Sequence, residues 1–442
     1  MSLFGFGKSD LPRIKGLSPR KARVISVLDV GSEKISCLIA RLRPRIAGEM
    51  LPDRTHTIEV IGVGHHRSRG IRSGAVVDIA AAELAIRQCV DAAERMAGLS
   101  VESLIVSVTA GRLKSVRRRA ETEVVGEVSQ ADLSRVTGNA AKMPLDDERV
   151  ALHSTVYDLQ LDDDAGLENP VGMTGDRLSA NLHMLTAEVA PLRNLEAAIN
   201  RAQLVVEAFV ATPYASALST MVEDEAAMGS ACIDMGSGAT TIAIFQNGRF
   251  VYADQIAIGG ANITMDLARG LSISPADAER IKVMHGSTLA ELLDDTGEPL
   301  SVAPLGDSGD AHPIVVKRSL VTKIIRPRVE ETLELVRDRL NASGLGHVIG
   351  KRVVLTGGAS QLAGLADTAR MVLQRNVRLG RPLGVTGLNP SSKGPGFSTS
   401  VGLLIYPQVA HREYVAERSL AVQAIDKAME GGRFGSWLRR AL

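Results

Sequence analysis

Two apolar, largely β-branched runs separated by a short polar turn mark the centre of the chain. Residues 232–245 read Cys-Ile-Asp-Met-Gly-Ser-Gly-Ala-Thr-Thr-Ile-Ala-Ile-Phe. Apolar runs of this length joined by glycine and serine predict a strand, a tight turn and a second strand. The first predicted strand ends at Asp234, so the pattern places a carboxylate beside a glycine-rich turn.

The same pattern occurs nearer the N-terminus, where residues 27–40 read Val-Leu-Asp-Val-Gly-Ser-Glu-Lys-Ile-Ser-Cys-Leu-Ile-Ala. Asp29 aligns with Asp234, and the glycine and serine that follow each aspartate align as well. A third apolar run leads into Gly357 and Gly358 and is followed by a helical pattern over residues 361–374. Similar segments so far apart in the chain predict two related lobes.

Glycine-rich turns beside an aspartate have a specific chemical use. Because glycine lacks a Cβ atom, its backbone N–H groups can approach a ligand closely, and several such groups together bind anions. A neighbouring aspartate can hold a metal ion through water. Either turn alone is equally compatible with an ordinary hairpin that has a polar tip. The repetition favours a phosphate site with metal-facing carboxylates.

Helical periodicity and end signals predict most of the remaining elements. We expect helices over residues 79–97, 191–203, 260–269, from 275 onward, and 318–343 with a bend near Pro327. Residues 110–190 predict a separate unit of strands backed by a helix. Its helix begins after the capping residue Ser129 and runs to Met143, and its two alternating strands cover residues 153–161 and 181–189.

Composition narrows the functional classes. The chain has 442 residues, of which 45% are hydrophobic and 23% charged, which is ordinary globular usage. Its net charge of +1 provides no bulk field that would attract nucleic acid. The scattered Cys37, Cys89 and Cys232 predict buried thiols in a reducing compartment rather than a disulfide framework or a zinc site. We expect no secretory signal and no membrane-spanning segment.

The two ends of the chain differ from its middle. Residues 1–23 are basic and rich in Gly, Ser and Pro, which predicts a flexible tail, and residues 407–430 predict a polar linker. In residues 431–442 one helical stripe holds Phe434, Trp437, Leu438, Ala441 and Leu442, flanked by Arg433, Arg439 and Arg440. Such a basic amphipathic helix is typical of membrane-surface binding, although docking on the protein's own core is the alternative.

The two hairpins and the strand–Gly–Gly–helix turn together resemble the actin, Hsp70 and sugar-kinase superfamily, in which ATP sits between two lobes. The inserted unit and the terminal helix make the chain similar to the FtsA family of bacterial division proteins. Further motifs that carry this resemblance are residues 61–64 through Asp78, 169–173, 277–286 and 355–359.

The resemblance implies an α/β, actin-like two-lobed fold with duplicated ribonuclease-H-like βββαβα cores. It also implies an inserted 1C subdomain and a C-terminal amphipathic helix. The implied boundaries are 24–104 and 191–228 for subdomain 1A, 105–190 for 1C, 229–264 and 326–406 for 2A with the return to 1A, and 265–325 for 2B.

The resemblance also implies roles for particular residues. Asp29 and Asp234 would face Mg²⁺, and the residues that would hold ATP are Gly31, Ser32, Lys34, Gly236, Ser237, Gly238, Thr240, Glu279, Lys282, Gly357, Gly358, Ala359 and Ser360. Lys317 and Arg318 are candidate anchors for the acidic C-terminal peptide of FtsZ. Phe434, Trp437, Leu438, Arg439, Arg440 and Leu442 would bind an anionic membrane surface.

The implied function is anchoring of the FtsZ ring to the cytoplasmic face of the inner membrane at the division septum. Polymerisation with other copies of the chain and contact with late division proteins accompany it, and no nucleic-acid partner is expected. Hydrolysis needs a residue that positions water, and the turn at residues 212–216 contains neither Gln nor Glu. We therefore expect slow or absent ATP turnover. A pilus- or secretion-assembly homologue and a small-metabolite kinase are the alternatives.

Overall fold

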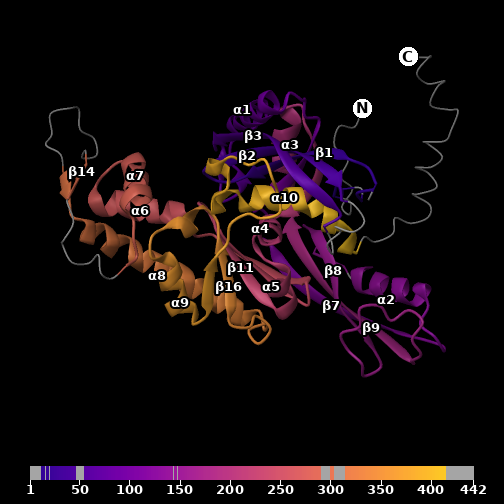
Figure 1. The fold of residues 1–442 in the computed structure, drawn as a ribbon. Coiled ribbons are helices and arrows are strands. Elements are labelled where there is room, and N and C mark those ends of the chain that lie inside the picture. Colours follow the sequence, from indigo (N-terminus) through magenta and orange to yellow (C-terminus); the bar gives the residue numbers. More distant parts are fainter. Residues whose placement is uncertain are drawn as a thin grey trace, which may run out of the picture.

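The computed structural model describes residues 11–14, 16–18, 20–45, 54–142, 144–146, 148–289, 299–302 and 314–414. The predicted terminal helix, and the predicted linker from residue 415 onward, lie outside the described residues. Figure 1 shows two lobes side by side, with an arm that carries α6 and α7 extending from one lobe and a small sheet backed by α2 at the opposite side.

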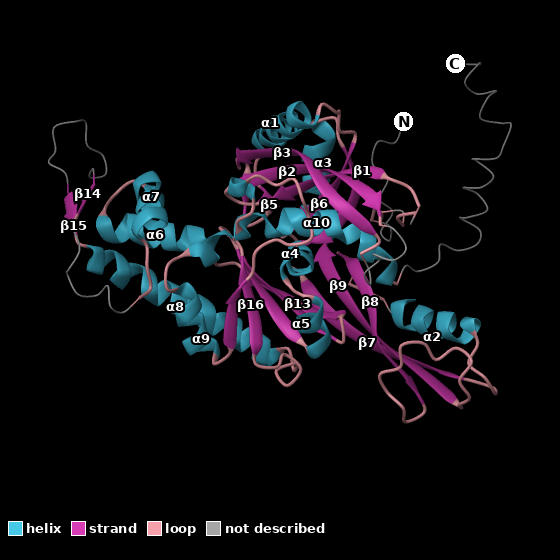
Figure 2. Cartoon of the chain, viewed as in Figure 1, coloured by secondary structure: helices cyan, strands magenta, loops and turns pink. Residues whose placement is uncertain are grey.

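Lobe 1 is built on a five-stranded sheet in the order β10-β6-β1-β2-β3. β2 is antiparallel to both β1 and β3, whereas β6 is parallel to β1 and β10 is parallel to β6. Its strands are β1 (Arg23–Val30), β2 (Lys34–Pro44), β3 (His56–Arg67), β6 (Ser103–Val108) and β10 (Val205–Ala211). A small hairpin, β4 (Ile71–Arg72) and β5 (Ala75–Val76), follows β3. Helices α1 (Ile79–Ala97) and α3 (Val189–Arg201) cover one face, and α4 (Thr212–Thr220) and α10 (Ser398–Val409) lie on the other (Figure 2).

Lobe 2 repeats this plan with the order β13-β12-β11-β16-β17. Its strands are β11 (Ser230–Met235), β12 (Thr240–Gln246), β13 (Arg249–Ile256), β16 (Arg352–Thr356) and β17 (Asn376–Leu379), and its helices are α5 (Glu223–Met228), α8 (Arg318–Ala342) and α9 (Leu365–Leu373). The arm adds α6 (Gly260–Leu271), α7 (Pro275–His285), β14 (Leu300–Val302) and β15 (Ile314–Val316). The matching strand orders confirm the predicted duplication of an α/β core.

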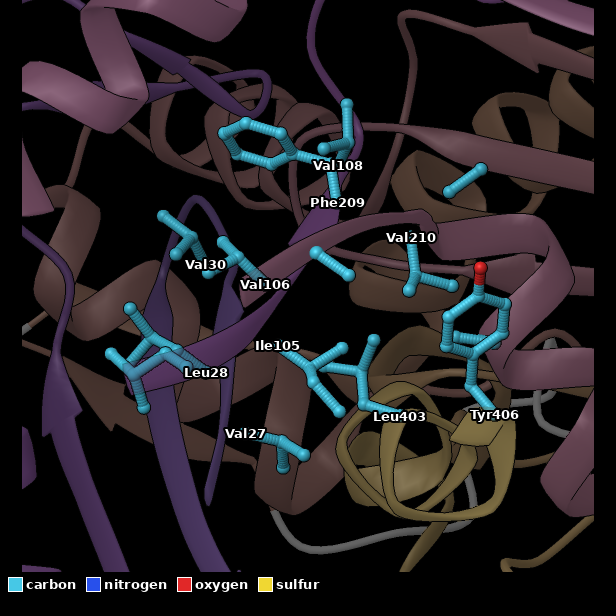
Figure 3. Packing of buried hydrophobic residues seen from close by; sticks show 14 of the residues in the cluster. Val27, Leu28, Val30, Ile105, Val106, Val108, Phe209, Val210, Leu403 and Tyr406 are labelled. Atoms are coloured by element: carbon cyan, nitrogen blue, oxygen red, sulfur yellow. The ribbon is translucent and has the colours of Figure 1, made fainter. Parts of the chain in front are cut away.

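The central strands of lobe 1 are buried on both faces, which explains their nearly continuous apolar runs. Val27 and Leu28 of β1 lie beside Ile105 and Val106 of β6, the pairing that the parallel register fixes. Figure 3 shows these side chains packing among residues of β10 and α10, all of them buried. This core holds the ends of β1 and α10 rigidly at the edge of the lobe that faces lobe 2.

The inserted unit is a three-stranded antiparallel sheet in the order β7-β9-β8, with α2 (Gln130–Lys142) packed on it. Its strands are β7 (Lys114–Glu123), β8 (Arg149–Leu161) and β9 (Arg177–Glu188). The sequence pattern indicates β8, β9 and the helix but not β7. β7 is an edge strand in which only Ala120 is buried, so it lacks the apolar alternation that reveals a half-buried strand.

End signals in the sequence place several helix ends correctly. Gly98 takes a left-handed conformation with φ 66° after α1, and the Ser274 side chain accepts a hydrogen bond from the backbone N–H of Asp277 at the start of α7. Pro327 lies inside α8, as the sequence predicts. Cys37, Cys89 and Cys232 are buried free thiols.

The body extends beyond both limits that the sequence suggests. Helix α10 runs through Pro407, which lies in its last turn, and every residue of this helix is buried. At the other end, Leu11, Ile14 and Leu17 pack against the core of lobe 1. Pro407 conceals that α10 continues to Val409. The apolar positions at 11, 14 and 17 are too few to reveal a docked segment by themselves.

Candidate nucleotide cleft

The glycine turns of the two hairpins face each other across a cleft of about 420 Å³ between the lobes. They approach so closely that a Cβ atom added to Gly238 would lie 2.3 Å from Ser32 Oγ. The Ser32 hydroxyl also accepts a hydrogen bond from the backbone N–H of Gly74, at 3.2 Å. The turn at Gly238 therefore packs against the Ser32 side chain of the other turn, and a side chain larger than glycine at residue 238 would displace that serine.

The cleft gathers both predicted metal-facing carboxylates and all but two of the predicted nucleotide-binding residues. Its lining includes Asp29, Gly31, Ser32, Lys34, Asp234, Gly236, Ser237, Gly238, Glu279, Lys282, Gly357, Gly358 and Ala359. The two others lie behind the wall. Thr240 is buried and donates to the Ile258 carbonyl at 2.8 Å, and Ser360 donates to the Gly357 carbonyl at 2.7 Å. These two hydroxyls hold the backbone of the neighbouring segments.

Asp29, at the end of β1, is held by two serine hydroxyls. Ser107 donates to Oδ1 at 2.8 Å, and Ser400 of α10 approaches Oδ2 at 3.5 Å. Burial raises the pKa of Asp29, whereas the hydrogen bond from Ser107 and the nearby charge of Lys34 act in the opposite direction. The carboxylate therefore gains from a cation in the cleft, because a positive charge would offset the unfavourable burial.

Asp234 occupies the equivalent position at the end of β11. Thr399 donates to its Oδ2 at 3.2 Å, and Asp234 is only 7% exposed. Burial, and then the like charge of Asp29, raise the pKa of Asp234 to about 6. Two carboxylates that repel each other at one cleft form a site suited to a divalent cation.

Lys34 begins β2 and reaches across the cleft toward the segment that precedes α10. Its ammonium donates to the Gly396 carbonyl at 2.7 Å and lies 3.4 Å from the centre of the Phe397 ring. Burial lowers the pKa of Lys34, and the charge of Asp29 opposes this shift. A buried cation with one carbonyl partner remains free to donate further hydrogen bonds to phosphate oxygens.

Glu279 and Lys282 lie on the face of α7 that looks into the cleft. Lys282 Nζ donates to Glu279 Oε2 at 2.6 Å, to Thr264 Oγ1 at 2.9 Å and to the Gly260 carbonyl at 3.1 Å. This network fixes α7 against the start of α6. The glutamate side chain is 40% exposed and the lysine 13%, so the carboxylate is the more accessible of the two to a ligand.

The third glycine turn closes the cleft on the side of lobe 2. Gly357 has φ 89°, and an added Cβ atom would lie 2.3 Å from Asp234 Oδ1. The turn continues into a short 3₁₀ helix, Gly358–Gln361, that lies on the cleft wall. A glycine is required here both for the positive φ and for the contact with the carboxylate.

Sequence reasoning missed the groups that hold the two aspartates. Thr399 and Ser400, consecutive residues at the start of α10, contact Asp234 and Asp29 respectively. Thr109 and Thr212 also line the cleft, where their hydroxyls lie 2.7 Å apart. The only sequence signal was the hydroxyl run of residues 398–400 ahead of an apolar stretch, a pattern too common to point to a site.

The predicted partner-binding residues lie elsewhere. Lys317 and Arg318 are exposed at the start of α8, next to β15 and away from the cleft lining. Within the described ranges, no helix is both long and apolar enough to cross a bilayer.

Duplicated sheets, a cleft between the lobes and an aspartate-bearing turn from each lobe define a protein of the actin-like fold class. Solved structures agree with this fold. The PilM–PilN type IV pilus biogenesis complex matches with a TM-score of 0.59 at 15% identity, covering 87% of this chain and 98% of its own. MreB5 of Spiroplasma citri bound to ADP matches with a TM-score of 0.50 at 13% identity, covering 93% and 99%.

The chain belongs to the FtsA family of bacterial cell division proteins. Residues 231–402 match the profile described as "Cell division protein FtsA", and residues 110–186 match "SHS2 domain inserted in FTSA". The cell division protein FtsA of Rhizobium meliloti (strain 1021) is 50% identical over 442 residues, which cover 100% of both chains. The resemblance seen in the sequence is thereby confirmed.

Proposed function

We propose that this cleft binds ATP with Mg²⁺ and that the loaded protein polymerises and anchors a division ring to the cytoplasmic face of the inner membrane. The proposal that the cleft binds a nucleotide is based on one observation. An aspartate-bearing glycine turn from each lobe faces the same cleft. The fold neighbour MreB5, which was solved bound to ADP, supports the choice of an adenine nucleotide.

The residues present fit this ligand. The Gly236 N–H is bonded to the Ala239 carbonyl within the turn, so the backbone N–H groups of Ser237 and Gly238 would contact phosphates. The half-buried Lys34 ammonium provides a cation beside them. Asp29 and Asp234 would hold Mg²⁺ through water, and the bound ion would neutralise phosphate charge. Glu279 and the third glycine turn would surround the nucleoside.

We further propose that turnover is slow. Thr109 and Thr212 line the cleft where α4 begins, and the turn at residues 212–216 has neither the Gln nor the Glu side chain that positions an attacking water in faster members of this fold class. Release of labelled phosphate in a single turnover tests this. A rate of about one per second, the lower end for kinases, would refute slow turnover.

Membrane attachment is proposed for residues 431–442, which lie outside the described residues. The test is flotation with anionic vesicles of the intact chain, a chain ending at Glu430 and the full-length variant Trp437→Glu, each with and without ATP. We expect the intact chain alone to float, more strongly with ATP because polymerisation joins many weak attachments. Equal flotation of all three would overturn the proposal.

The exposed start of α8 is the proposed docking face for the acidic peptide of FtsZ, with the side chains of Lys317 and Arg318 as anchors. Exposed charges of this kind mainly accelerate association and make it sensitive to salt. The double variant Lys317→Glu/Arg318→Glu should slow association with the labelled peptide, and Arg337→Glu on the same helix is the control. Identical association rates and salt dependence in both variants would exclude this face.

A further inference from the structure

A basic surface lies on lobe 1 where the two ends of the described chain meet. Residues 11–24 contain five Lys or Arg residues and no Asp or Glu. Arg13, Arg20 and Lys21 are exposed, and among the described residues no carboxylate forms an ion pair with any of the three. Arg43 at the end of β2 adds a fourth cation, whose side chain is 57% exposed and pairs with Glu59 at 3.1 Å.

This segment is held firmly on the body. Leu11, Ile14 and Leu17 pack against the core of lobe 1, which fixes the backbone that carries the basic side chains. The His56 ring donates to the carbonyl of Lys21 at 3.2 Å, and the His56 backbone N–H donates to Gln408 of α10 at 2.9 Å. The basic surface therefore lies beside the last turn of α10.

The chain leaves the body at the same place. Arg13 donates to the Tyr414 carbonyl at 3.4 Å, and the Tyr414 backbone N–H donates to the Ser154 carbonyl at 2.7 Å. Tyr414 is the last described residue, and 28 residues follow it in the sequence. Those residues end in the basic amphipathic pattern, so a surface that this tail binds is kept within reach of the basic surface.

Among the described residues, the carboxylates at this end of the lobe are already engaged. Glu207 pairs with Arg23, Glu59 lies 3.1 Å from Arg43, and the buried Glu413 accepts from His153 at 2.8 Å. The outward field of the surface is therefore positive although the whole chain is almost neutral, with a net charge of +1. Such a local field attracts anions within about 8 to 10 Å at physiological salt.

We infer that the basic surface of Arg13, Arg20, Lys21 and Arg43 contacts the headgroups of anionic phospholipids directly, as a second membrane attachment of the folded body. The inference rests on the proposed tail tether, which raises the effective concentration of lipid at this surface. Each basic side chain near such a membrane contributes about fivefold in affinity. Two weak attachments together hold a protein that either alone would release quickly.

The test uses the full-length chain and its variant Arg20→Gln/Lys21→Gln, whose two side chains make no hydrogen bond or ion pair within the described residues. A second double variant, Arg337→Gln/Lys351→Gln, is the control and removes two cations from lobe 2: the partly exposed Arg337, which pairs with Asp338 at 3.4 Å, and the exposed Lys351. Binding to vesicles of phosphatidylcholine, with increasing fractions of phosphatidylglycerol, is measured by flotation at low and high salt.

We expect the Arg20/Lys21 variant to bind anionic vesicles roughly 25-fold less tightly than the control variant, about fivefold for each side chain removed, and to bind pure phosphatidylcholine equally well. Equal binding of the two variants to anionic vesicles would overturn the inference. The variant Trp437→Glu distinguishes attachment by the tail from attachment by the basic surface. If Trp437→Glu does not reduce binding to either kind of vesicle, the tail proposal is wrong, whatever the result for the basic surface. If an oligonucleotide binds this surface and displaces anionic vesicles from the intact chain but not from the Arg20/Lys21 variant, the surface serves nucleic acid and the lipid inference is wrong.

Discussion

The close contact between helices α4 and α10 can be tested by a single substitution. Gly402 of α10 lies against the backbone of α4, where an added Cβ atom would come 1.7 Å from the Ala215 carbonyl oxygen and 2.3 Å from its carbon. Ordinary contact requires 3.4 Å, so the two helices would have to separate by about 1.7 Å. A backbone carbonyl cannot rotate away as a flexible side chain can.

Gly402→Ala should therefore destabilise the protein. Overpacking of a core costs about 1 to 3 kcal/mol, and the rigid backbone contact places this case toward the upper value. Replacing glycine by alanine inside a helix recovers at most about 1 kcal/mol. The expected net loss is about 2 kcal/mol in the free energy of unfolding. Because Thr399 lies at the start of the same helix and contacts Asp234, ATP affinity should fall as well.

Thermal and urea unfolding, together with titration of a fluorescent ATP analogue, would measure both effects. Gly346→Ala is the matched control, since an added Cβ atom there meets nothing within 4 Å. We expect a lower midpoint and weaker nucleotide binding for Gly402→Ala and unchanged values for Gly346→Ala. Equal stability and affinity of the two variants would refute the reasoning that this crossing sets the geometry of the cleft.

Three further predictions concern charged side chains of the cleft and of the core. The pKa of Asp234 is raised to about 6, so this carboxyl favours folding at low pH and loses that contribution as the pH rises from 3.8 to about 6. In calorimetric titrations, Mg²⁺-dependent ATP binding by the parent protein should weaken as the pH falls below about 6. The variant Asp234→Asn should bind ATP weakly at every pH. A parent affinity that does not change with pH would contradict this prediction. Glu413→Ala leaves Nδ1 of the buried His153 without its acceptor, while Nε2 still accepts from the Ala211 N–H. The loss should cost about 1 to 3 kcal/mol in thermal unfolding, more than Glu413→Gln. Equal losses would show that the hydrogen bond is unimportant. Lys282→Met removes a hydrogen-bond donor to Glu279 and should lower ATP affinity about tenfold in the same titration. Lys282→Arg keeps the positive charge and should retain most of the affinity. Equal ATP affinities of the two variants would exclude a role for the charge.

Local signals in the sequence were sufficient to predict the two hairpins and several helix ends. The repeated hairpins predicted two lobes, and both turns now face one cleft with their aspartates, Asp29 and Asp234, beside each other. The capping residue Ser274 and the terminating Gly98 marked helix ends correctly. These features could be predicted because a strand–turn–strand pattern or a helix cap depends on residues that are neighbours in the chain.

Other parts of the site depend on contacts between distant residues. Ser400 lies 371 positions from Asp29 in the sequence, and Thr399 lies 165 positions from Asp234, yet both hydroxyls contact these carboxylates. No local pattern distinguishes them from other serines and threonines. The basic surface likewise exists only because the fold brings Arg13 beside Tyr414, 401 positions away.

The sequence alone therefore determined that two similar halves each present a glycine turn and a carboxylate. Only the tertiary structure decided what surrounds those carboxylates, how closely α4 and α10 cross at Gly402, and where the chain leaves the body. The physical reason is that hydrophobic periodicity and turn chemistry act over a few residues, whereas burial, like-charge repulsion and close backbone contact arise between segments that only folding brings together.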